Sequence, residues 1–342
     1  MANTPNFIET IVISTRIRLA RNFASYPFPK RMDDAQAQDI VYLVGEGLKK
    51  IDDFTQYDVA SLDKLNGLWL QEQYLVSPAL LKSKRGAAFV SSDKSISIMV
   101  NEEDHLREQY ICKGFALYKA YERISGIDDG LSATYDFAYE DKLGFLTACP
   151  SNLGTGMRAS VMMFLPGLTE NGGLKKLLPS IKAQGMTVRG AFGEGTTAEG
   201  YLYQISNERT LGVSEQEILE EMTRTTMMVC DLEIRAREEM KKASEILLRD
   251  RCLRAYGALT HCALLTAQEF SEKMLEVRLG TALGFFQIHD LAGFEDFFTA
   301  MRPATFRVSN DLQGLSEKKC DEIRAETVGN ALPELVGITR KK

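Results

Sequence analysis

Residues 95–107 read SISIMVNEEDHLR. The apolar, β-branched part, 95–100, predicts a buried strand, and it runs directly into a polar segment made of Asn101, Glu102, Glu103, Asp104, His105 and Arg107. Three successive carboxylates are costly to desolvate and add nothing to a hydrophobic core. This acidic strand end is therefore either a solvated turn or a site that needs fixed negative charge. Arg107, four residues after Glu103, favours a site that holds a cation and an anion together.

The composition is that of an ordinary globular protein. The length of 342 residues is enough for one large domain or two ordinary ones. The net charge is −6, and 44% of the residues are hydrophobic and 26% charged. The acidic balance disfavours direct binding of nucleic acid, because such proteins are more often basic. No apolar run reaches the roughly 18–20 residues of a membrane span, and the N-terminus lacks the pattern of a secretory signal.

The cysteines and histidines give no metal signature. Cys112, Cys149, Cys230, Cys252, Cys262 and Cys320 are scattered without a CxxC pair, and the chain has three histidines. This spacing argues against a structural zinc site. Without a secretory signal, we expect reduced thiols and a cytoplasmic protein.

Hydrophobic periodicity predicts an α/β body over about the first 210 residues. Strand patterns cover 9–14, 87–92, 95–100, 186–192 and 200–207, and helical spacing covers 33–51, 113–127 and 174–184. Gly185 stands where a helix C-cap is expected. Residues 137–150 predict a hairpin that turns at Glu140 and Asp141, followed by a strand that ends at Cys149.

The pattern changes at Ser214. A long, charged helix is predicted from there to about Leu248, with Ser214 and Glu217 as a capping box. Helical spacing continues to the end of the chain, with breaks near Gly280 and Pro303. A mainly helical region is therefore expected to follow the α/β body.

Several segments place arginine beside small polar residues or at a strand end. Arg16 and Arg18 lie in STRIR (14–18), Arg107 ends NEEDHLR, Arg158 lies in CPSNLGTGMRAS (149–160) and Arg189 in VRGAFGEG (188–195). Arg209, in QISNER, fits a strand end and a turn. Each arginine alone is ordinarily a solvated surface residue. Together they resemble a polyphosphate clamp, because planar guanidinium groups match phosphate oxygens, and Arg16 and Arg18 share one face of an extended chain.

Other nucleotide-binding motifs are absent from the sequence. NLGTGMRAS has arginine where a Walker A loop has lysine, with different spacing, and no HRD or DFG set of a protein kinase occurs. If this chain binds a nucleotide, arginines hold it.

The carboxylates indicate a second function for the same site. Glu103 and Glu194 each lie near a strand end and one of these arginines. Two carboxylates that face one pocket can orient a guanidinium group and accept its proton during attack on phosphorus. Alternation along the strand directs Glu102 and Asp104 away from Glu103, towards support or solvent. Cys149, among cations that favour a thiolate, is either reactive or a small buried hydrophobe.

Long strings of this sequence resemble the catalytic domain of the phosphagen (guanidino) kinases. They are STRIRLARN (14–22), NEEDHLR (101–107), LTACPSNLGTGMRASVMMFLP (146–166) and VRGAFGEG (188–195) with QISN (204–207), in order and at compatible spacing. Within that superfamily, VMMFLP, the GEG loop and VRLGTALGF (277–285) are similar to the bacterial protein-arginine kinases of the McsB type.

The resemblance implies an α+β fold, with an antiparallel β-sheet flanked by helices and related to that of glutamine synthetase. It implies a catalytic domain over residues 10–250 and a helical C-terminal region over 251–342. The implied reaction is ATP-dependent phosphorylation of arginine side chains in proteins. ATP and Mg²⁺ are the implied cofactors, and the metal is held through ATP rather than by protein ligands.

The resemblance also implies roles for individual residues. Glu103 is expected to be the main catalytic base, Glu194 to hold the other side of the guanidinium, and Cys149 to tune its reactivity. Arg16, Arg18, Arg107, Arg158 and Arg189 are expected to clamp the phosphates. The full ATP-binding set comprises Ser14, Thr15, Arg16, Ile17, Arg18, Tyr74, Arg107, Arg158, Ala159, Ser160, Val161, Met162, Arg189, Gly190, Ala191, Phe192 and Gly193.

Three departures from the family pattern stand out. Tyr74 replaces a nucleotide-contacting histidine, although tyrosine can still stack on a nucleotide or hydrogen-bond to it. Leu68 replaces a family arginine. The phosphoarginine-binding motif RDxxRA reads CDEIRA (320–325), with Cys320 in place of the first arginine. Asp321 can still pair with a guanidinium group and Arg324 with a phosphate; the alternative is a charged helix face.

Two other functions remain open at this stage. The first is phosphorylation of free arginine or another guanidino compound. We expect no helical lid domain before the first motif, which begins at Ser14, and an uncovered site favours an arginine on another protein. The second is a phosphoarginine-binding regulator with weakened catalysis, which Tyr74 and Leu68 motivate.

The resemblance finally implies partners and a setting. Expected partners are protein substrates with exposed arginine, a heat-shock repressor, a Clp-type unfoldase, a zinc-binding activator protein and a second copy of the chain as a homodimer. The implied role is to mark stress-response proteins for regulation or degradation.

Overall fold

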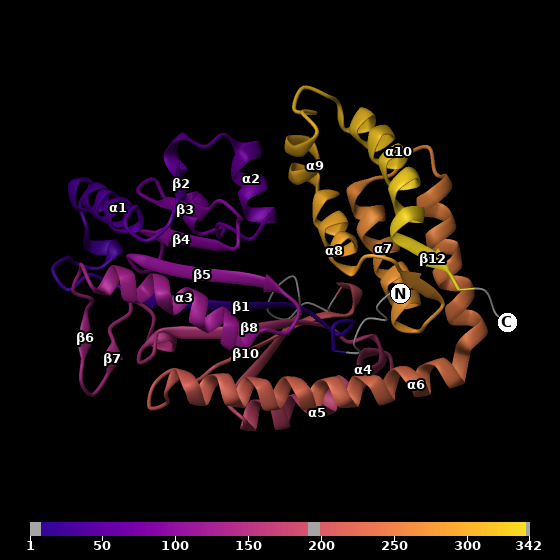
Figure 1. The fold of residues 1–342 in the computed structure, drawn as a ribbon, viewed down its shortest axis with the longest axis horizontal. Coiled ribbons are helices and arrows are strands. Elements are labelled where there is room, and N and C mark those ends of the chain that lie inside the picture. The colour runs from indigo at the N-terminus through magenta and orange to yellow at the C-terminus, as the bar shows by residue number, and fades with distance from the viewer. Residues whose placement is uncertain (1–7, 191–198, 340–342) are drawn as a thin grey trace.

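The computed structural model describes residues 8–190 and 199–339. An eight-stranded sheet in the order β2-β3-β4-β5-β1-β8-β10-β9 runs through the centre of the part of the chain that precedes α7, Ala267–Ala282 (Figure 1). All of its neighbouring strands pair antiparallel. Its strands are β1 (Val12–Arg21), β2 (Phe54–Asp58), β3 (Ala87–Ser91), β4 (Ile96–Val100), β5 (Leu106–Lys113), β8 (Met157–Phe164), β9 (Met186–Gly190) and β10 (Leu202–Asn207).

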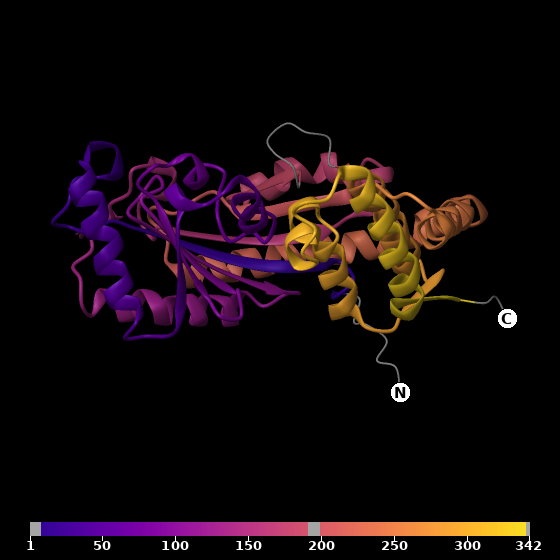
Figure 2. The same ribbon diagram turned by 90° about the horizontal axis from the view of Figure 1, so that it is seen from above.

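The helices lie around this sheet and beside it. They are α1 (Asp34–Leu48), α2 (Lys64–Glu72), α3 (Leu117–Ser132), α4 (Pro166–Glu170), α5 (Gly173–Ala183), α6 (Glu215–His261), α7 (Ala267–Ala282), α8 (Leu291–Ala300), α9 (Pro303–Ser309) and α10 (Glu317–Leu335). Two small ribbons, β6 (Tyr139–Glu140) with β7 (Gly144–Phe145) and β11 (Phe286–Ile288) with β12 (Val336–Ile338), complete the described elements. Seen from above, the helices α7–α10 gather at one end of the sheet (Figure 2). In the described part, no helix is long and apolar enough to cross a membrane.

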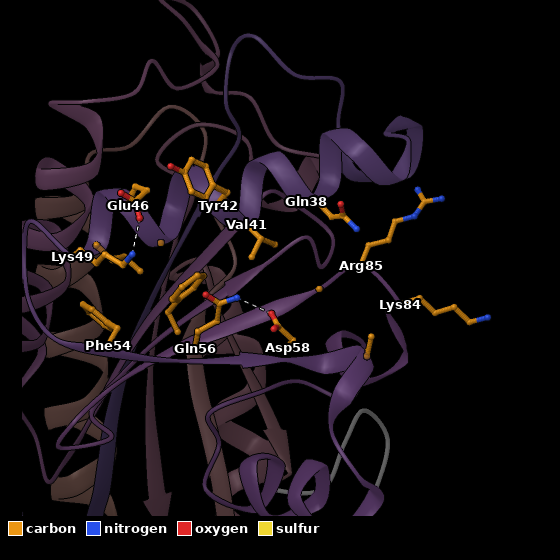
Figure 3. Close-up of a pocket in the computed structure, with 15 residues that line it drawn as sticks. Gln38, Val41, Tyr42, Glu46, Lys49, Phe54, Gln56, Asp58, Lys84 and Arg85 are labelled. Atoms are coloured by element: carbon orange, nitrogen blue, oxygen red, sulfur yellow. Dashed lines mark hydrogen bonds and ion pairs between the residues drawn. The ribbon is translucent and has the colours of Figure 1, made fainter.

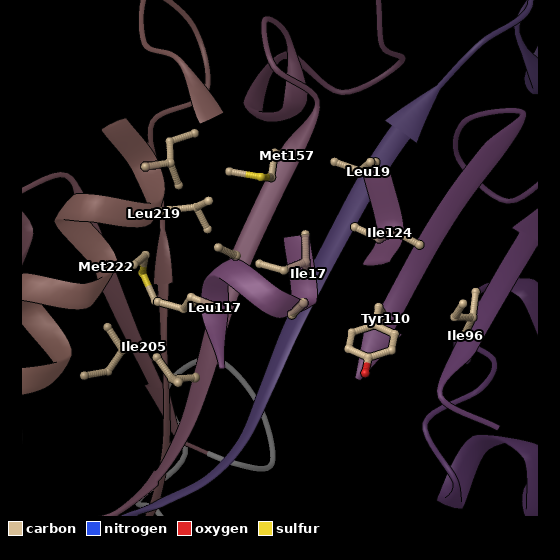
Figure 4. Close-up of a cluster of buried hydrophobic side chains, with 14 of the residues drawn as sticks. Ile17, Leu19, Ile96, Tyr110, Leu117, Ile124, Met157, Ile205, Leu219 and Met222 are labelled. Carbon is tan, nitrogen blue, oxygen red and sulfur yellow. The ribbon is translucent and has the colours of Figure 1, made fainter. Parts of the chain in front are cut away.

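One face of the sheet packs on α1, α3 and the first half of α6. Alternation along β1 places Ile17 and Leu19 on this face, where they meet Leu117 and Ile124 of α3 (Figure 4). Leu219 and Met222 of α6 pack against the same cluster. Each of these side chains is almost fully buried, and burying an aliphatic side chain of this size contributes about 1.5–3 kcal/mol. The opposite face of the central strands is thereby left to polar residues.

A second cluster of buried residues forms among α7–α10 and the second half of α6. Phe164, at the end of β8, belongs to this cluster and joins it to the sheet. Helix α6 passes from one cluster to the other, with a break in helical geometry at Ser244. The two parts of the chain therefore share one long helix.

The predicted fold class and most elements are confirmed. The antiparallel sheet, α1, β3, β4, the β9–β10 pair and the helix that ends before Gly185 lie where the patterns placed them. The Ser214–Glu217 capping box is present, although α6 continues to His261 rather than ending near Leu248. The predicted break near Pro303 corresponds to the start of α9, whereas Gly280 lies inside α7.

Three further boundaries were predicted wrongly. Strand β1 continues through the STRIR segment to Arg21 instead of ending at 14, because its polar residues alternate with core residues. Strand β5 extends to Lys113, and a turn at Gly114, with φ of +69°, delays the next helix to Leu117. The strand expected to end at Cys149 ends at Phe145, and a 3-10 turn begins at Pro150.

Candidate active site

Five arginines lie on one face of the sheet, opposite the hydrophobic core. Residues paired across neighbouring strands point to the same side. Arg18 of β1 pairs with Arg158 of β8, and Ala20, two positions along, pairs with Arg107 of β5. Gln204 of β10 pairs with Arg189 of β9 and accepts a 3.0 Å hydrogen bond from Arg16. Segments far apart in the sequence therefore converge as one row of cations.

These cations repel one another at short range. Burial, followed by the nearby charge of Arg107, lowers the pKa of Arg16 to about 10. Burial and the charges of Arg16 and its neighbours lower the pKa of Arg18 well below its usual value. Burial, and then Arg189 and Arg107, lower the pKa of Arg158. The Nε atom of Arg18 is buried and has no hydrogen-bond partner among the residues that the structure describes. Such a cluster fits a polyanion, because phosphate oxygens would satisfy the donors and relieve the repulsion.

The loop between β4 and β5 uses nearly all of its side chains to hold itself in place. Asn101, with φ of +60°, donates to the carbonyl oxygens of Ala37 and Arg85 at 2.9 and 3.1 Å. Glu102 accepts a hydrogen bond from Ser77 and forms an ion pair with Arg107 at 2.7 Å. The loop is therefore fixed to α1 on one side and to the residues after α2 on the other.

Asp104 and His105 fix the same loop to other segments of the chain. Asp104 accepts hydrogen bonds from Asn22 at 2.7 Å and from the backbone N–H of Ala148 at 2.6 Å. His105 is fully buried, accepts from the backbone N–H of Phe23 through Nδ1, and donates to the carbonyl of Pro27 through Nε2. Burial lowers the pKa of His105 to about 4, so the neutral imidazole is the form at neutral pH.

Glu103 is the exception in this loop. It is exposed and has no hydrogen-bond or ion-pair partner among the described residues. The neighbouring residues fix the loop that carries Glu103, and Arg107 of the anion site follows four residues later. The Glu103 carboxylate is therefore available for a cationic ligand. Of the two alternatives predicted for Glu102 and Asp104, support or solvent, the structure shows support, because both side chains fix the loop.

Cys149 lies in the loop that follows the β6–β7 ribbon. Its Sγ atom is 3.1 Å from the hydroxyl oxygen of Ser151, and the thiol is half-buried. Cys149 is one of the groups that raise the pKa of Arg158, although burial and the neighbouring arginines have the larger effect and lower it. Because Asp104 binds the backbone of Ala148, the loops of Cys149 and Glu103 are tied together directly.

The remaining residues of the predicted ATP-binding set divide by strand alternation. Ser14 and Met162 pair across β1 and β8 on the face of the arginines, and Ser160 lies opposite Arg16. The side chains of Thr15, Ile17, Ala159 and Val161 are buried on the opposite face, so these four can contact a ligand on the arginine face only through their backbone. Gly190 ends β9. Ala191, Phe192, Gly193 and Glu194 lie outside the described residues.

Tyr74 follows α2 and has a backbone φ of +60°, which is uncommon for a residue with a side chain. Its ring is half exposed, and its hydroxyl accepts a 2.7 Å hydrogen bond from Arg302. Local sequence patterns do not predict this contact, because the two residues are 228 positions apart. Leu68 is exposed on α2.

The motif at 320–325 does not form a solvated charged face. Cys320 is fully buried and Arg324 is 2% exposed on α10. Arg324 pairs with Asp321 at 2.6 Å, donates to the carbonyl of Leu265 at 2.9 Å and lies 4.8 Å from the ring centre of Phe306. The alternative interpretation as a charged helix face is wrong for Arg324, because its guanidinium is turned inwards.

A cavity of about 590 Å³ lies on the other side of the sheet, between α1 and the strands β2 and β3 (Figure 3). Its lining includes an ion pair between Glu46 and Lys49 and a hydrogen bond from Gln56 to Asp58. The register places Gln56 on the face of Phe89 and the hydrophobic core. This cavity is therefore separate from the row of arginines.

Magnesium has no ligand set of its own in the described part, where no group of three or more His, Cys, Asp or Glu side chains is placed to hold a metal. The donors that face the anion site are cationic, so they fit the phosphate oxygens of a nucleotide and not a bare cation. Mg²⁺ fits this face when it is bound together with those phosphates.

Comparison with known proteins agrees with this geometry. Residues 37–236 match the family described as ATP:guanido phosphotransferase, C-terminal catalytic domain. The chain belongs to the ATP:guanido phosphotransferase family. Residues 245–341 match the domain described as Protein-arginine kinase McsB C-terminal domain, so this member of the family has both parts.

Two curated relatives of this ATP:guanido phosphotransferase are similar over nearly their whole length. A protein-arginine kinase of Caldanaerobacter subterraneus subsp. tengcongensis is 41% identical over 330 residues, which are 95% of this chain and 97% of the relative. A protein-arginine kinase of Clostridium novyi is 38% identical over 331 residues, covering 94% and 93%.

Solved structures of two other kinases share the fold. Lombricine kinase superposes with a TM-score of 0.60 over 68% of each chain at 24% identity, which supports the fold alone. The duplicated taurocyamine kinase from Schistosoma mansoni, with bound transition state analog components, gives a TM-score of 0.63 at 25% identity. That match covers 80% of this chain and 40% of the other.

Proposed function

We propose that this chain is a protein-arginine kinase that transfers the γ-phosphoryl group of ATP to a guanidinium nitrogen of an arginine side chain. The observation that carries the proposal is the row of five arginines on one sheet face, together with the exposed carboxylate of Glu103, which has no partner among residues 8–190 and 199–339. The first set fits a polyphosphate and the second a cation, which are the charges of the two substrates.

The arginines bind and orient the phosphates. Arg16, Arg18 and Arg158 come from adjacent strands, so their spacing is set by the sheet and not by flexible loops. Arg107 is held at its position by Glu102. Fixed donors of this kind stabilise the negative charge of the transferring phosphoryl group without reorganisation during the reaction. Mg²⁺, when bound with ATP, supplies further neutralisation of the phosphate charge.

Glu103 accepts the proton of the acceptor. As a guanidinium nitrogen attacks the γ-phosphorus, a P–N bond forms, the bond from the γ-phosphorus to the bridging oxygen breaks, and ADP leaves. The proton lost by that nitrogen passes to the Glu103 carboxylate. We assign Cys149 to the guanidinium side of the site, because its loop is tied to that of Glu103 through Asp104. Glu194 remains a proposed second carboxylate outside the described residues.

An arginine within a protein is the acceptor we favour over free arginine. The support is the name of the relatives, protein-arginine kinase, at 38–41% identity over nearly full length. The McsB C-terminal domain over 245–341 adds to this. The lombricine and taurocyamine kinases share the catalytic fold at lower identity.

The test is incubation of the full chain with ATP, Mg²⁺ and an arginine-containing protein such as casein. Mass spectrometry under non-acidic conditions, which preserve the labile P–N bond, is expected to find phosphoarginine on the protein. Free arginine is assayed in parallel by coupled ADP release, and Glu103→Gln serves as the inactive control. Turnover of free arginine without phosphoarginine on the protein would identify a small-molecule guanidino kinase instead.

The remaining features of the biological setting are proposals that rest on family resemblance. We propose a cytoplasmic, homodimeric enzyme that acts in the stress response with a heat-shock repressor, a Clp-type unfoldase and a zinc-binding activator protein. We likewise propose phosphoarginine binding at Asp321 and Arg324, and a division into a catalytic domain over 10–250 and a C-terminal region over 251–342. Sedimentation equilibrium tests the dimer, and limited proteolysis near residue 250 tests the boundary.

A further inference from the structure

The N-terminus of α9 is bound to the end of α2. The Glu72 carboxylate accepts hydrogen bonds from the backbone N–H of Ala304 at 3.0 Å and of Thr305 at 2.7 Å. The Thr305 hydroxyl adds a bond to the same carboxylate at 2.9 Å and accepts one from Gln73 at 3.0 Å. Figure 1 shows α2 and α9 facing each other, although α9 belongs to the C-terminal helical region. One side chain of the catalytic half thus holds the start of a helix from the other half.

Arg302, directly before α9, extends this contact to Tyr74. Its Nη1 donates to the backbone carbonyl of Glu72, and its Nη2 donates to the Tyr74 hydroxyl at 2.7 Å. The guanidinium carbon lies 4.6 Å from the centre of the Tyr74 ring, a distance at which a cation is attracted to the aromatic face. Arg302 therefore restrains both the backbone and the side chain of the residues that follow α2.

The restrained segment continues onto the face of the arginines. Gln109, which pairs with Arg18 across β5 and β1, donates to the carbonyl of Tyr74 at 2.6 Å. Ser97 of β4 donates to the carbonyl of Leu75. Ser77 donates to Glu102, the carboxylate that holds Arg107. The contacts form one continuous path from α9 to a member of the anion site.

Tyr74 also lies within electrostatic reach of that site. The pKa of Arg16 is lowered first by burial and next by Arg107, and Tyr74 is the group that opposes these effects. The positive φ of Tyr74 is unfavourable for an aromatic residue and persists only where its surroundings fix it. The contacts of Arg302, Glu72 and Gln109 are the surroundings that do so.

We propose that Arg302 and Glu72 are positioning residues for the nucleotide: they lock segment 72–77 so that Tyr74 and Arg107 are placed to bind a nucleoside polyphosphate. The C-terminal region thereby completes the nucleotide side of the catalytic site. This inference rests on the proposed function for the identity of the ligand, but it concerns nucleotide affinity and not the acceptor.

The experiment measures MgADP binding to the full chain by isothermal titration calorimetry, for the wild type, Arg302→Ala and Arg307→Ala. Arg307 is the matched control: it lies within α9, five residues after Arg302, and pairs with Glu317 at 2.7 Å, without an observed hydrogen bond to α2. We expect Arg302→Ala to raise the Kd for MgADP about tenfold, equivalent to about 1.4 kcal/mol. We expect Arg307→Ala to change the Kd less than twofold.

Steady-state kinetics and a second pair of variants separate positioning from general damage to the fold. Arg302→Ala should raise KM for MgATP while leaving KM for the protein acceptor unchanged. Tyr74→Phe, which removes the hydroxyl that accepts from Arg302, should weaken MgADP binding in the wild type and have little further effect in Arg302→Ala. Glu72→Gln, checked for retained circular dichroism and Tm, should weaken MgADP binding in the same direction.

Equal Kd values for Arg302→Ala and Arg307→Ala would overturn the inference, as would parallel increases in both KM values. The pattern is read from binding and needs no phosphoryl transfer. If the expected Kd pattern is seen but no protein becomes phosphorylated on arginine, the inference stands and the proposed acceptor is wrong. A wild-type chain without measurable affinity for MgADP would overturn both.

Discussion

Glu102 and Arg107 form an ion pair in which one guanidinium nitrogen lies 3.0 and 2.7 Å from the two carboxylate oxygens. The Glu102 side chain is 6% exposed and also accepts from Ser77. Its neighbour Glu103 is exposed and has no partner in the described part of the chain. Two adjacent glutamates therefore differ in role: one fixes an arginine of the anion site, and the other is available to a substrate.

The first prediction separates these two roles by kinetics. Glu103→Gln should lower kcat by about 10²–10⁴-fold, the usual contribution of a general base, while MgADP binding stays close to that of the wild type. Glu102→Gln should instead raise KM for MgATP, because Arg107 loses its fixed partner. Initial rates at varied ATP, together with calorimetry, measure both. If the two variants had the same kinetic effects, the assignment of separate roles would fail.

The second prediction is that replacing Arg18 stabilises the chain without nucleotide but weakens nucleotide binding. This guanidinium has a buried Nε without a hydrogen-bond partner in the described part of the chain, and the charges of Arg16 and its neighbours act on it more strongly than that of Glu102. Arg18→Met removes a buried cation for which burial and repulsion from Arg16 and its neighbours outweigh the attraction to Glu102, so we expect the free energy of unfolding without nucleotide to rise by about 1 kcal/mol. MgADP affinity should fall at least tenfold, because a phosphate-binding donor is lost.

Arg21 on the same strand is the control for this prediction. It binds Asp128 through two nitrogens, at 3.0 and 2.8 Å, and is 2% exposed. Arg21→Met leaves the Asp128 carboxylate without its cation and should cost about 3–5 kcal/mol. Thermal unfolding with and without MgADP checks both variants. A lower Tm for Arg18→Met without nucleotide would contradict the interpretation that burial and neighbouring cations destabilise the charged form of Arg18.

The sequence identified the residues of this site better than it identified what holds them. Arg16, Arg18, Arg107, Arg158 and Arg189 lie within motifs that can be read locally, and alternation predicted that Arg16 and Arg18 share a face. That all five share it follows from strand pairing, such as Arg18 with Arg158, which local patterns do not encode.

The supporting contacts were harder to predict for the same reason. Arg302 and Glu72 are 230 positions apart and belong to different halves of the chain. An arginine before a proline and a glutamate at a helix end are common surface residues, so neither carries a signal by itself. Only the packing of α9 on α2 gives them a role at the nucleotide.

The third prediction follows from the protonation of His105. Its Nδ1 accepts from the Phe23 N–H and its Nε2 donates to Pro27. A second proton would have to bind Nδ1, where its N–H would face the N–H of Phe23. Burial lowers the pKa of His105 from 6.5 to about 4. The unfolded chain therefore binds a proton that the folded chain does not bind between these pH values, and stability should fall by about 3 kcal/mol as the pH decreases from 6.5 to 4.

Urea unfolding of the wild type and His105→Asn, at several pH values between 7 and 4, measures this effect. Asparagine keeps an acceptor for the Phe23 N–H but has no proton to gain in this range. The variant should be less stable at pH 7, and the difference in the free energy of unfolding should become smaller as the pH falls. A difference that stays constant over the range would show that His105 titrates equally in both states.

The last prediction concerns the residue that departs from the family motif. Cys320 is fully buried on α10, one helical turn before Arg324, whose guanidinium already occupies the interior between Asp321, Leu265 and Phe306. An arginine at 320 would place a second cation beside the first on the same helix face, away from water.

Cys320→Arg should therefore lower the free energy of unfolding by about 3 kcal/mol or more, whereas Cys320→Ala should cost much less. Chemical denaturation measures both, and phosphoarginine titration is carried out on each. If Cys320→Arg kept the wild-type stability and bound phosphoarginine more tightly, position 320 would have to reach solvent, and the inward packing of the motif would be wrong.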